Sequence, residues 1–478
     1  MKATLINTKL MRCRRPSKFR RFQKTTNSTK KYSFLLILLL AVIIGSVICL
    51  IKSQEAFDLY LQSILPFFLW GSALTIMFPE NRFLHIAILL QLMGSILQST
   101  LQNYMLNENL IFFISTFLIA LLFKNYQFEV KWQLLGLIDI CLFLLIVAFG
   151  VDINGTKAWV SIVGFSFQAT ELIKLCVIIM LGTVFSKKEY SDIKKFVLAL
   201  SITLLNVLGL AILRELGTGI MIGMIFMTGS LLFLEKRYIV WTLVGFVIGT
   251  IVLFLICFII HANYDFLSST PISSIASLFE KISTRVLILF QPEMEDLGYQ
   301  SLQAKYAVMT GGVFGSKEVI HVPAGSTDLA LISLILNFGI TSSIVYICLF
   351  IKQILEAIDQ IQNNKVREKR SQVQQQINSV SMLLLMESFL RMTCMIFCNL
   401  GVLPLVGLPF PYISNGLTAA ITLWIYDMYH VGGVEYEKKQ YIYLQVPGLK
   451  IYGRDRIGHR NLHNDRKVWI HSRPKSIN

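Results

Sequence analysis

The chain has 478 residues, of which 54% are hydrophobic and 15% are charged, and its mean hydropathy is +0.62. This composition excludes a water-soluble globular domain and is typical of a membrane protein. The net charge of +16 is concentrated in the two tails and in short connections between apolar segments, where topology and anionic lipid headgroups favour cations. The basic stretch "RCRRPSKFRRFQK" therefore needs no nucleic-acid partner, and we predict none.

Twelve apolar segments approach or reach the length of about 17 to 25 residues with which a helix crosses a bilayer. The first apolar run is long and no small-residue cleavage site follows it, so we expect a membrane helix there and not a cleaved signal peptide. The sequence thus predicts an all-α polytopic membrane protein with about twelve transmembrane helices. The segments are 34–51, 59–78, 84–101, 110–123, 134–150, 171–185, 195–213, 217–234, 238–260, 328–351, 379–400 and 416–432, of which the fourth and sixth could lie partly in the interface.

Lys and Arg residues in the short connections predict the orientation of these helices. Residues 1–31 carry eleven Lys or Arg and no acid, and the tail from Gly433 carries ten against four acids, so we place both termini in the cytoplasm. Alternate connections such as "SKKEYSDIKK" and "KVREKR" hold most of the other cations, which agrees with an even number of crossings. The stretch 261–327 is then the only long extracytoplasmic loop, and loops of this length are usually functional or disordered.

Two parts of this loop carry signals of structure and of binding. Residues 275–290, "IASLFEKISTRVLILF", have the apolar periodicity of an amphipathic helix that lies on the membrane surface or against the bundle. Further on, Lys305, Lys317 and His321 place positive or titratable groups close in sequence to Asp328. This arrangement suits an anionic ligand at the outer face.

Asp328 opens the apolar run "DLALISLILNFG", and two interpretations of it stay open. As the last residue of "STD" before a helix it can be an N-cap, because a carboxylate accepts hydrogen bonds from the first amides and favours the positive helix end. A half-desolvated carboxylate at the mouth of a bundle can instead have the raised pKa that a general base requires. One residue could serve both purposes.

Two pairs of charged residues fall inside or at the edge of predicted membrane helices, where charges usually face the bundle interior or water. Glu171 and Lys174 lie three residues apart, and Glu387 and Arg391 lie four apart, so each pair can share one helix face as a structural ion pair. Alternatively, Glu171 lines a cavity and Arg391 reaches a diphosphate from the bundle interior, which suits the geometry of a guanidinium.

Five motifs follow one another along residues 150–432. They are "GVDINGTKAWVSIVGFSFQATELIKL" (150–175), "RELGTGIMIG" (214–223), "GYQSLQAKYAVMTGGVFGSK" (298–317), "STDLALISLILNFG" (326–339) and "GVLPLVGLPFPYISNG" (401–416). In this order, with the long outer loop between the right helices, they resemble the SEDS family, the shape, elongation, division and sporulation proteins that include FtsW, RodA and SpoVE.

The resemblance implies a fold and an activity. Family members have a core of ten helices, which two extra N-terminal spans would precede here. They polymerise glycan strands of peptidoglycan from the undecaprenyl-diphosphate-linked precursor lipid II at the outer face of the bacterial cytoplasmic membrane. They work with a class B penicillin-binding protein, a transpeptidase, in cell division, elongation or sporulation. The essential acid of the family aligns with Asp328.

The implied chemistry also suggests site residues. Transfer of a sugar from a diphosphate-linked lipid needs a base near the attacking hydroxyl and positive charge near the departing diphosphate. We expect Asp328 to be that base or a substrate-orienting acid. The candidate substrate-binding residues are Lys305, Lys317, Glu171, Lys174, Arg391 and Lys157, the last where the family often has Arg. Diphosphate chemistry often uses a divalent cation, but no ligand cluster in the sequence indicates a metal site.

The chain divides by this interpretation into four parts. They are a basic cytoplasmic tail (1–32), N-terminal transmembrane helices (33–150), a SEDS-like core with the outer loop (151–432) and a basic cytoplasmic tail (433–478).

Departures from the family pattern leave an alternative function open. Leu336-Asn337 stands where the family has Glu-Glu, and Arg214-Glu215 where it has Pro-Asp. The alternative is a non-catalytic membrane protein, either a flippase for lipid-linked precursors or a scaffold that recruits a transpeptidase.

Overall fold

The computed structural model describes residues 17–103, 106–125, 131–153, 156–162, 165–270, 273–290, 298–318, 320–363 and 372–445. The chain divides into two compact units, Met1–Tyr436 and Glu437–Asn478. The fold and the sites below are those of the first unit. The described part of the second unit, residues 437–445, continues the last helix.

All twelve predicted apolar segments coincide with helices. These are α1 (Ser17–Lys52), α2 (Gln54–Met77), α3 (Arg82–Thr100), α4 (Leu106–Asn125), α5 (Trp132–Phe149), α6 (Ala169–Ser186), α7 (Asp192–Ile212), α8 (Leu216–Phe233), α9 (Lys236–Ala262), α13 (Ala330–Asn363), α14 (Gln372–Asn399) and α15 (Leu417–Gln445). Within the described part of the chain, ten helices are long and apolar enough to cross a membrane. They include α4 and α6, whose predicted apolar segments were short. Helix α8 contains a shorter apolar helix. The protein is therefore a helical, polytopic membrane protein.

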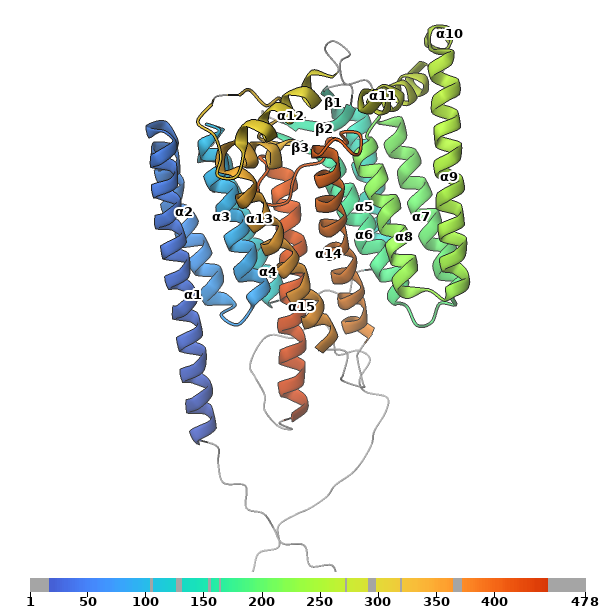
Figure 1. Ribbon diagram of the computed structural model, residues 1–478. Coiled ribbons are helices and arrows are strands. Elements are labelled where there is room, and N and C mark those ends of the chain that lie inside the picture. Colours follow the sequence, from blue (N-terminus) through green and yellow to red (C-terminus); the bar gives the residue numbers. More distant parts are fainter. Residues whose placement is uncertain are drawn as a thin grey trace, which may run out of the picture. The chain divides into compact units, whose positions relative to one another are not determined.

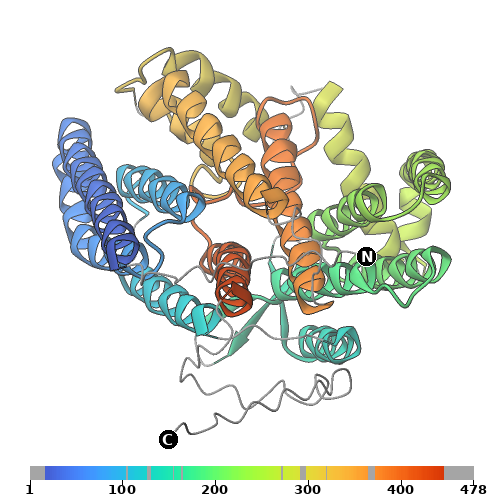
Figure 2. The same cartoon turned by 90° about the horizontal axis from the view of Figure 1, so that it is seen from below.

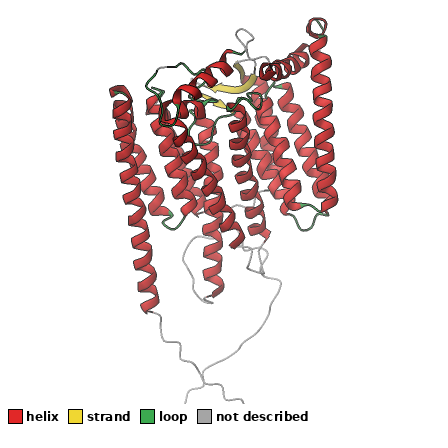
Figure 3. Cartoon of the chain, in the orientation of Figure 1, coloured by secondary structure: helices red, strands yellow, loops and turns green. Residues whose placement is uncertain are grey.

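A small antiparallel sheet lies at one end of the bundle, which we call the sheet end (Figure 1 and Figure 3). Its strands β1 (Gly150–Ile153), β2 (Thr156–Ile162) and β3 (Phe165–Gln168) pair in sequence order within the connection from α5 to α6. The prediction of an all-α chain missed this sheet. The stretch "VDINGTKAWV" carries the signal for it, because Asn-Gly between two runs with β-branched residues favours a β-hairpin.

Three helices outside the bundle form most of the long connection between α9 and α13. They are α10 (Tyr264–Ser268), α11 (Ser273–Phe290) and α12 (Tyr299–Gly311). Helix α11 confirms the amphipathic helix predicted over 275–290, and it packs against α9 and α7. Figure 1 shows α11 and α12 at the sheet end, lying across the direction of the long helices.

Segments far apart in the sequence meet at the sheet end through hydrogen bonds. The amide of Lys157 in β2 donates to the carbonyl of Leu213 after α7, at 3.1 Å. Ser414 Oγ, between α14 and α15, donates to the carbonyl of Thr327, before α13, at 2.6 Å. Each of these bonds joins two connections that lie far apart in the sequence.

Helix α15 stands in the middle of the bundle as seen in Figure 2, with α3 and α4 on one side and α6 and α14 on the other. Its Trp424 is fully buried, and its ring centroid lies 4.7 Å from that of Trp70 in α2. Tyr412, which precedes α15, donates to Asp427 Oδ2 at 2.6 Å and accepts a hydrogen bond from Gln353 of α13. These contacts fix the loop before α15 to the interior of the bundle.

Helix α13 is broken at Gly339, whose φ of +82° is not helical. The short loop after α12 docks into this break, where the amide of Ser316 donates to the carbonyl of Leu336 at 2.8 Å. A Cβ at position 339 would lie 2.1 Å from the carbonyl oxygen of Val313, so only glycine fits between loop and helix.

Replacing Gly339 by alanine is expected to destabilise the protein by about 1–3 kcal/mol, because the new Cβ strains the backbone and meets Val313. Gly219→Ala in α8 is the matched control, since nothing lies within 4 Å of a Cβ built there, and it is expected to be neutral or slightly stabilising. Thermal unfolding of both variants in one detergent measures the difference. Equal midpoints would contradict a structural role for the break.

Candidate functional site

Asp328 lies at the sheet end, in the tight turn that precedes α13. The turn contains Ala324, whose φ is +52°, and the amides of Thr327 and Leu329 both donate to the Ala324 carbonyl at 3.0 Å. Directly after Asp328, every residue from 329 to 336 is buried. The half-buried carboxylate is therefore placed where a polar turn meets the apolar interior.

Three consecutive backbone carbonyls, from Ser326 to Asp328, hold this turn in place, and we call them with their donors the carbonyl clamp. The carbonyl of Ser326 accepts hydrogen bonds from Gln98 Nε2 (3.0 Å) and from the backbone amide of Asn415 (2.7 Å). The carbonyl of Thr327 accepts one from Ser414 Oγ (2.6 Å), and that of Asp328 accepts one from Asn399 Nδ2 (3.0 Å). These donors come from α3, from the end of α14 and from the loop before α15. The position of Asp328 is thus determined by elements far apart in the sequence.

The side chain of Asp328 does not cap α13. Within the described residues it makes no hydrogen bond to a backbone amide of this helix. The amide of Leu329 is instead satisfied by the carbonyl of Ala324, and that of Ser333 by the carbonyl of Leu329. The N-cap interpretation of Asp328 is therefore not supported.

Arg285 of α11 is the cation whose charge acts on Asp328, although the two side chains form no ion pair among the described residues. Its Nη1 donates to the carbonyl of Leu405 at 2.8 Å. Burial raises the pKa of Asp328 to about 6, and the positive charge of Arg285 opposes this rise by stabilising the ionised carboxylate. Burial in turn lowers the pKa of Arg285, whereas Asp328 and Glu215 raise it, so the guanidinium keeps its charge.

The loop before α15 contacts both members of this pair. Its Leu405 carbonyl accepts the hydrogen bond from Arg285, and a Cβ at Gly407 would lie 3.6 Å from Asp328 Oδ2. Gly407 has a φ of +71°, which a side chain would strain. The motif "GVLPLVGLPFPYISNG" therefore contacts Asp328 and Arg285 through its backbone and not through charged side chains.

The pair of Asp328 and Arg285 combines a base with a fixed cation. A carboxylate with a pKa near 6 can accept a proton from a hydroxyl close to neutral pH. A guanidinium binds phosphate oxygens through a planar fork of donors. Across the described residues, no group of three or more His, Cys, Asp and Glu is placed to hold a metal ion.

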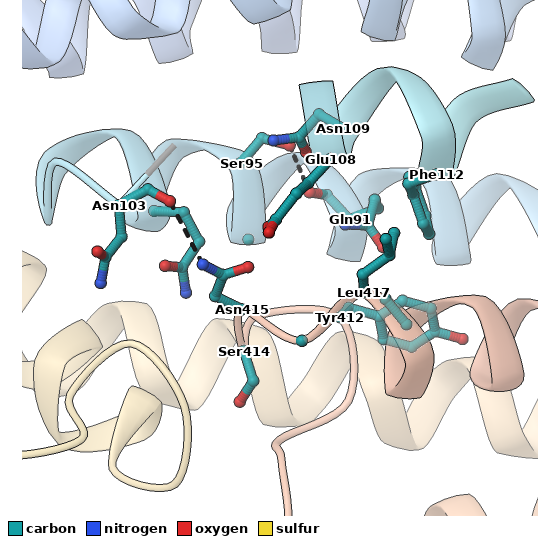
Figure 4. A pocket seen from close by; sticks show the side chains of 14 residues that line it. Gln91, Ser95, Asn103, Glu108, Asn109, Phe112, Tyr412, Ser414, Asn415 and Leu417 are labelled. Atoms are coloured by element: carbon teal, nitrogen blue, oxygen red, sulfur yellow. Dashed lines mark hydrogen bonds between the residues drawn. The ribbon is translucent and has the colours of Figure 1, made fainter. Parts of the chain in front are cut away.

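A small cavity of about 50 Å³ lies beside the carbonyl clamp (Figure 4). Figure 4 shows Glu108 of α4 and Asn415 of the loop facing the same space, which Gln91 and Gln98 of α3 also line. Gln98 Oε1 is buried and has no hydrogen-bond partner among the described residues. Roughly a few water molecules fit such a volume and can satisfy these groups, whereas a sugar does not fit. We therefore infer that this cavity supports the carbonyl clamp and does not bind a sugar.

The two charged pairs predicted in α6 and α14 form a single buried cluster. Lys174 Nζ lies 2.8 Å from Glu171 Oε1 and 3.0 Å from Glu387 Oε1. Arg391 Nη2 lies 2.6 Å from Glu387 Oε1 and 3.6 Å from Glu171 Oε2, and all four side chains are at most 1% exposed. Because these charges compensate one another and join α6 to α14, the structure favours the structural interpretation of both pairs. Substrate binding by Glu171, Lys174 and Arg391 stays a prediction.

The other predicted cations do not gather around Asp328. Lys305 in α12 and Lys317 after it are exposed, and neither is among the charges that act on Asp328. Lys157 Nζ donates to the carbonyl of Val147 at 3.1 Å, near the C-terminus of α5, where a cation is favoured. Closeness in sequence to Asp328 thus did not mean closeness in space, and substrate binding by these lysines stays a prediction.

Three residues around Asp328 were not predicted from the sequence. Arg285 had a signal, because it is the last charge before the apolar run "VLILF" of the amphipathic helix, and a charge there needs a partner. Gln98 and Asn399 had no such signal in the sequence, since side-chain amides within apolar helices serve many structural purposes. Their role follows only from the hydrogen bonds to the clamp.

The geometry defines a class: a polytopic membrane protein with a half-buried acid, acted on by the charge of a nearby cation, at one end of its helical bundle. Comparison with known proteins narrows this class. The model of the FtsW, RodA and SpoVE family, described as "Cell cycle protein", matches residues 72–428, well over half of the chain, and the chain belongs to this family. The match begins near the end of α2, so α1 and most of α2 lie outside it.

Individual proteins of known sequence or structure are also similar to this chain. The peptidoglycan glycosyltransferase MrdB of Escherichia coli (strain K12) is 23% identical over 300 residues, which cover 59% of this chain and 73% of MrdB. The probable peptidoglycan glycosyltransferase FtsW of Enterococcus hirae is 24% identical over 291 residues, or 58% of this chain and 67% of that protein. A chain in a solved peptidoglycan synthase complex has a similar fold, with a TM-score of 0.57, 17% identity and coverage of 75% of this chain and 97% of that one.

Removing one charge from the buried cluster is expected to destabilise the protein strongly. In Lys174→Met, Glu171 and Glu387 lose a shared cation, so the free energy of unfolding is expected to fall by about 3–5 kcal/mol. The double variant Glu171→Gln/Lys174→Met removes one charge of each sign and is expected to recover much of this loss. Thermal unfolding in detergent compares the two, and a double variant no more stable than Lys174→Met would contradict charge compensation.

Proposed function

We propose that this protein polymerises glycan strands of peptidoglycan from lipid II. The observation that carries the proposal is the half-buried carboxylate of Asp328, which the carbonyl clamp holds beside Arg285. Membership of the family, whose similar members include named peptidoglycan glycosyltransferases, supports the same activity. At the positions of the missing Glu-Glu pair, Leu336 is buried and Asn337 Nδ2 donates to the carbonyl of Ser333 at 2.9 Å.

In the proposed reaction, a sugar hydroxyl attacks the anomeric carbon of a second sugar. The new bond joins the hydroxyl oxygen to this carbon, and the bond from the carbon to the diphosphate oxygen breaks. Asp328 accepts the proton of the hydroxyl, and Arg285 compensates the charge that develops on the departing lipid diphosphate. With a pKa of about 6, Asp328 is mostly ionised at pH 7 and still basic enough to take the proton.

The proposal includes a location and a partner. All twelve helices would cross the bacterial cytoplasmic membrane, ten as the core and α1 and α2 as an extra pair, with both termini in the cytoplasm. The sheet end would then face outward, where lipid II is used, and the cationic connections opposite the sheet end support this orientation. A class B penicillin-binding protein would crosslink the strands in division, elongation or sporulation, and the similar fold in a peptidoglycan synthase complex supports such a partner.

Asp328→Asn is expected to lower the rate of glycan synthesis about 10²–10⁴-fold, because the isosteric amide cannot accept the proton. The rate is measured with purified protein, lipid II and a class B penicillin-binding protein. Asp265→Asn in α10 is the matched control, since it removes an exposed acid in the same long connection, and it is expected to keep the wild-type rate. If the wild type makes no strands even with its partner, the protein is instead a flippase or a scaffold.

Arg285→Gln is expected to lower the same rate about 10²–10³-fold, because the departing diphosphate loses a fixed cation. Lys305→Gln and Lys317→Gln remove exposed charges that do not act on Asp328, and both are expected to stay near the wild-type rate. The comparison decides between Arg285 and the lysines predicted from the sequence. A loss in either lysine variant, with Arg285→Gln unaffected, would place the diphosphate over the loop and not beside Asp328.

A further inference from the structure

A second cavity, of about 280 Å³, lies at the end of the helices opposite the sheet end. Its lining comes from the last turns of α6 and α8, the connection into α7 and its first turn, and the neighbouring ends of α13 and α14. The volume is near the lower limit of about 300–1,000 Å³ that is typical of small-molecule pockets. The cavity shares no lining residue with the site around Asp328, and the proposed transfer reaction does not use it.

One side of this cavity is apolar. The rings of Phe185 in α6 and Phe233 in α8 stack with centroids 5.7 Å apart and planes at 23°. Ile361 and Met382 extend this side, and Leu232, which is 47% exposed, continues it onto the outer surface of the bundle. An apolar wall that reaches the lipid-facing surface suits the hydrocarbon part of an amphiphile.

The other side carries positive charge without an acid among its described lining residues. Lys195 Nζ lies 3.2 Å from Asp192 Oδ1, whose other oxygen accepts a hydrogen bond from the Glu235 amide at 3.2 Å. Lys188 is exposed and forms no ion pair within the described part of the chain. Asp192 is therefore shared between Lys195 and the start of α9, and the charge of Lys188 is left uncompensated.

Uncharged donors complete this polar side. Asn378 Oδ1 accepts a hydrogen bond from Gln374 Nε2 at 3.1 Å, whereas Asn378 Nδ2 is buried and has no acceptor among the described residues. Ser379, the next residue, is 8% exposed and also lines the cavity. Buried donors are nearly always paired, so the free amide of Asn378 is a donor that a ligand in the cavity can use.

We propose that this cavity binds the phosphate head group of an anionic phospholipid from the leaflet at this end of the bundle. Phosphate oxygens would accept charge-assisted hydrogen bonds from Lys188 and Lys195 and a further one from Asn378 Nδ2. The start of the acyl chains would lie against Phe185 and Phe233. The continuous apolar wall favours a lipid over a soluble phosphate compound, which would leave that wall uncovered.

The test uses the purified full-length protein with phosphatidylglycerol or phosphatidylcholine, and native mass spectrometry measures the lipid retained. Wild type is expected to retain the anionic lipid roughly tenfold better than the zwitterionic one, because the choline cation of phosphatidylcholine offsets the phosphate charge that the two lysines attract. The double variant Lys188→Gln/Lys195→Gln is expected to lose this preference. Lys194→Gln is the matched control, since Lys194 does not line the cavity and its ammonium lies over the Tyr190 ring at 4.1 Å, so it is expected to keep the preference.

A second variant covers the case in which the double lysine variant fails to fold. Asn378→Asp is nearly isosteric, removes the free donor and adds a negative charge, so it is expected to abolish retention of phosphatidylglycerol. An unchanged preference in this variant or in a folded double lysine variant would overturn the proposal. Displacement of the lipid by millimolar inorganic phosphate or glycerol phosphate would also overturn it, because the site would then take a free phosphate group. The readout is lipid retention, so the result does not depend on glycan synthesis.

Discussion

The carbonyl clamp is the constraint on which the candidate site depends. Asp328 belongs to a turn whose carbonyls accept hydrogen bonds from α3, α14 and the loop before α15, and these bonds fix the turn to the bundle. The same loop anchors Arg285 through the carbonyl of Leu405 and approaches the carboxylate at Gly407. Acid and cation are therefore preorganised by shared backbone, and substrate binding energy is not needed to bring them together.

Two groups of charged residues in the described part of this protein differ in their surroundings. Glu171, Lys174, Glu387 and Arg391 compensate one another between α6 and α14, far from solvent, and this arrangement favours a structural role. Asp328 and Arg285 lie at the sheet end, where burial raises the pKa of Asp328 and lowers that of Arg285. Chemistry is expected from the second group, because its side chains keep donors and acceptors for a substrate.

Much of the fold could be predicted from the sequence, and less of the site. Apolar length located all twelve helices, and apolar periodicity located α11. The sheet between α5 and α6 was missed because its strands are short and lie in a connection between two predicted membrane helices, where hydropathy predicts no structure. Asp328 was found through its position and a family resemblance, whereas Arg285 approaches it from another element. Such proximity depends on how α11 lies across the bundle, which no local pattern in the sequence encodes.

The pH dependence of glycan synthesis tests the central claim, that Asp328 acts as a base beside Arg285. Ionised Asp328 is required, so the wild-type rate is expected to fall as the pH drops below about 6. Arg285 lowers the pKa of Asp328, so Arg285→Gln, in the activity that remains, is expected to move this acid limb to higher pH. A limb near the ordinary aspartate value of 3.8, or one at the same pH in both proteins, would contradict the account.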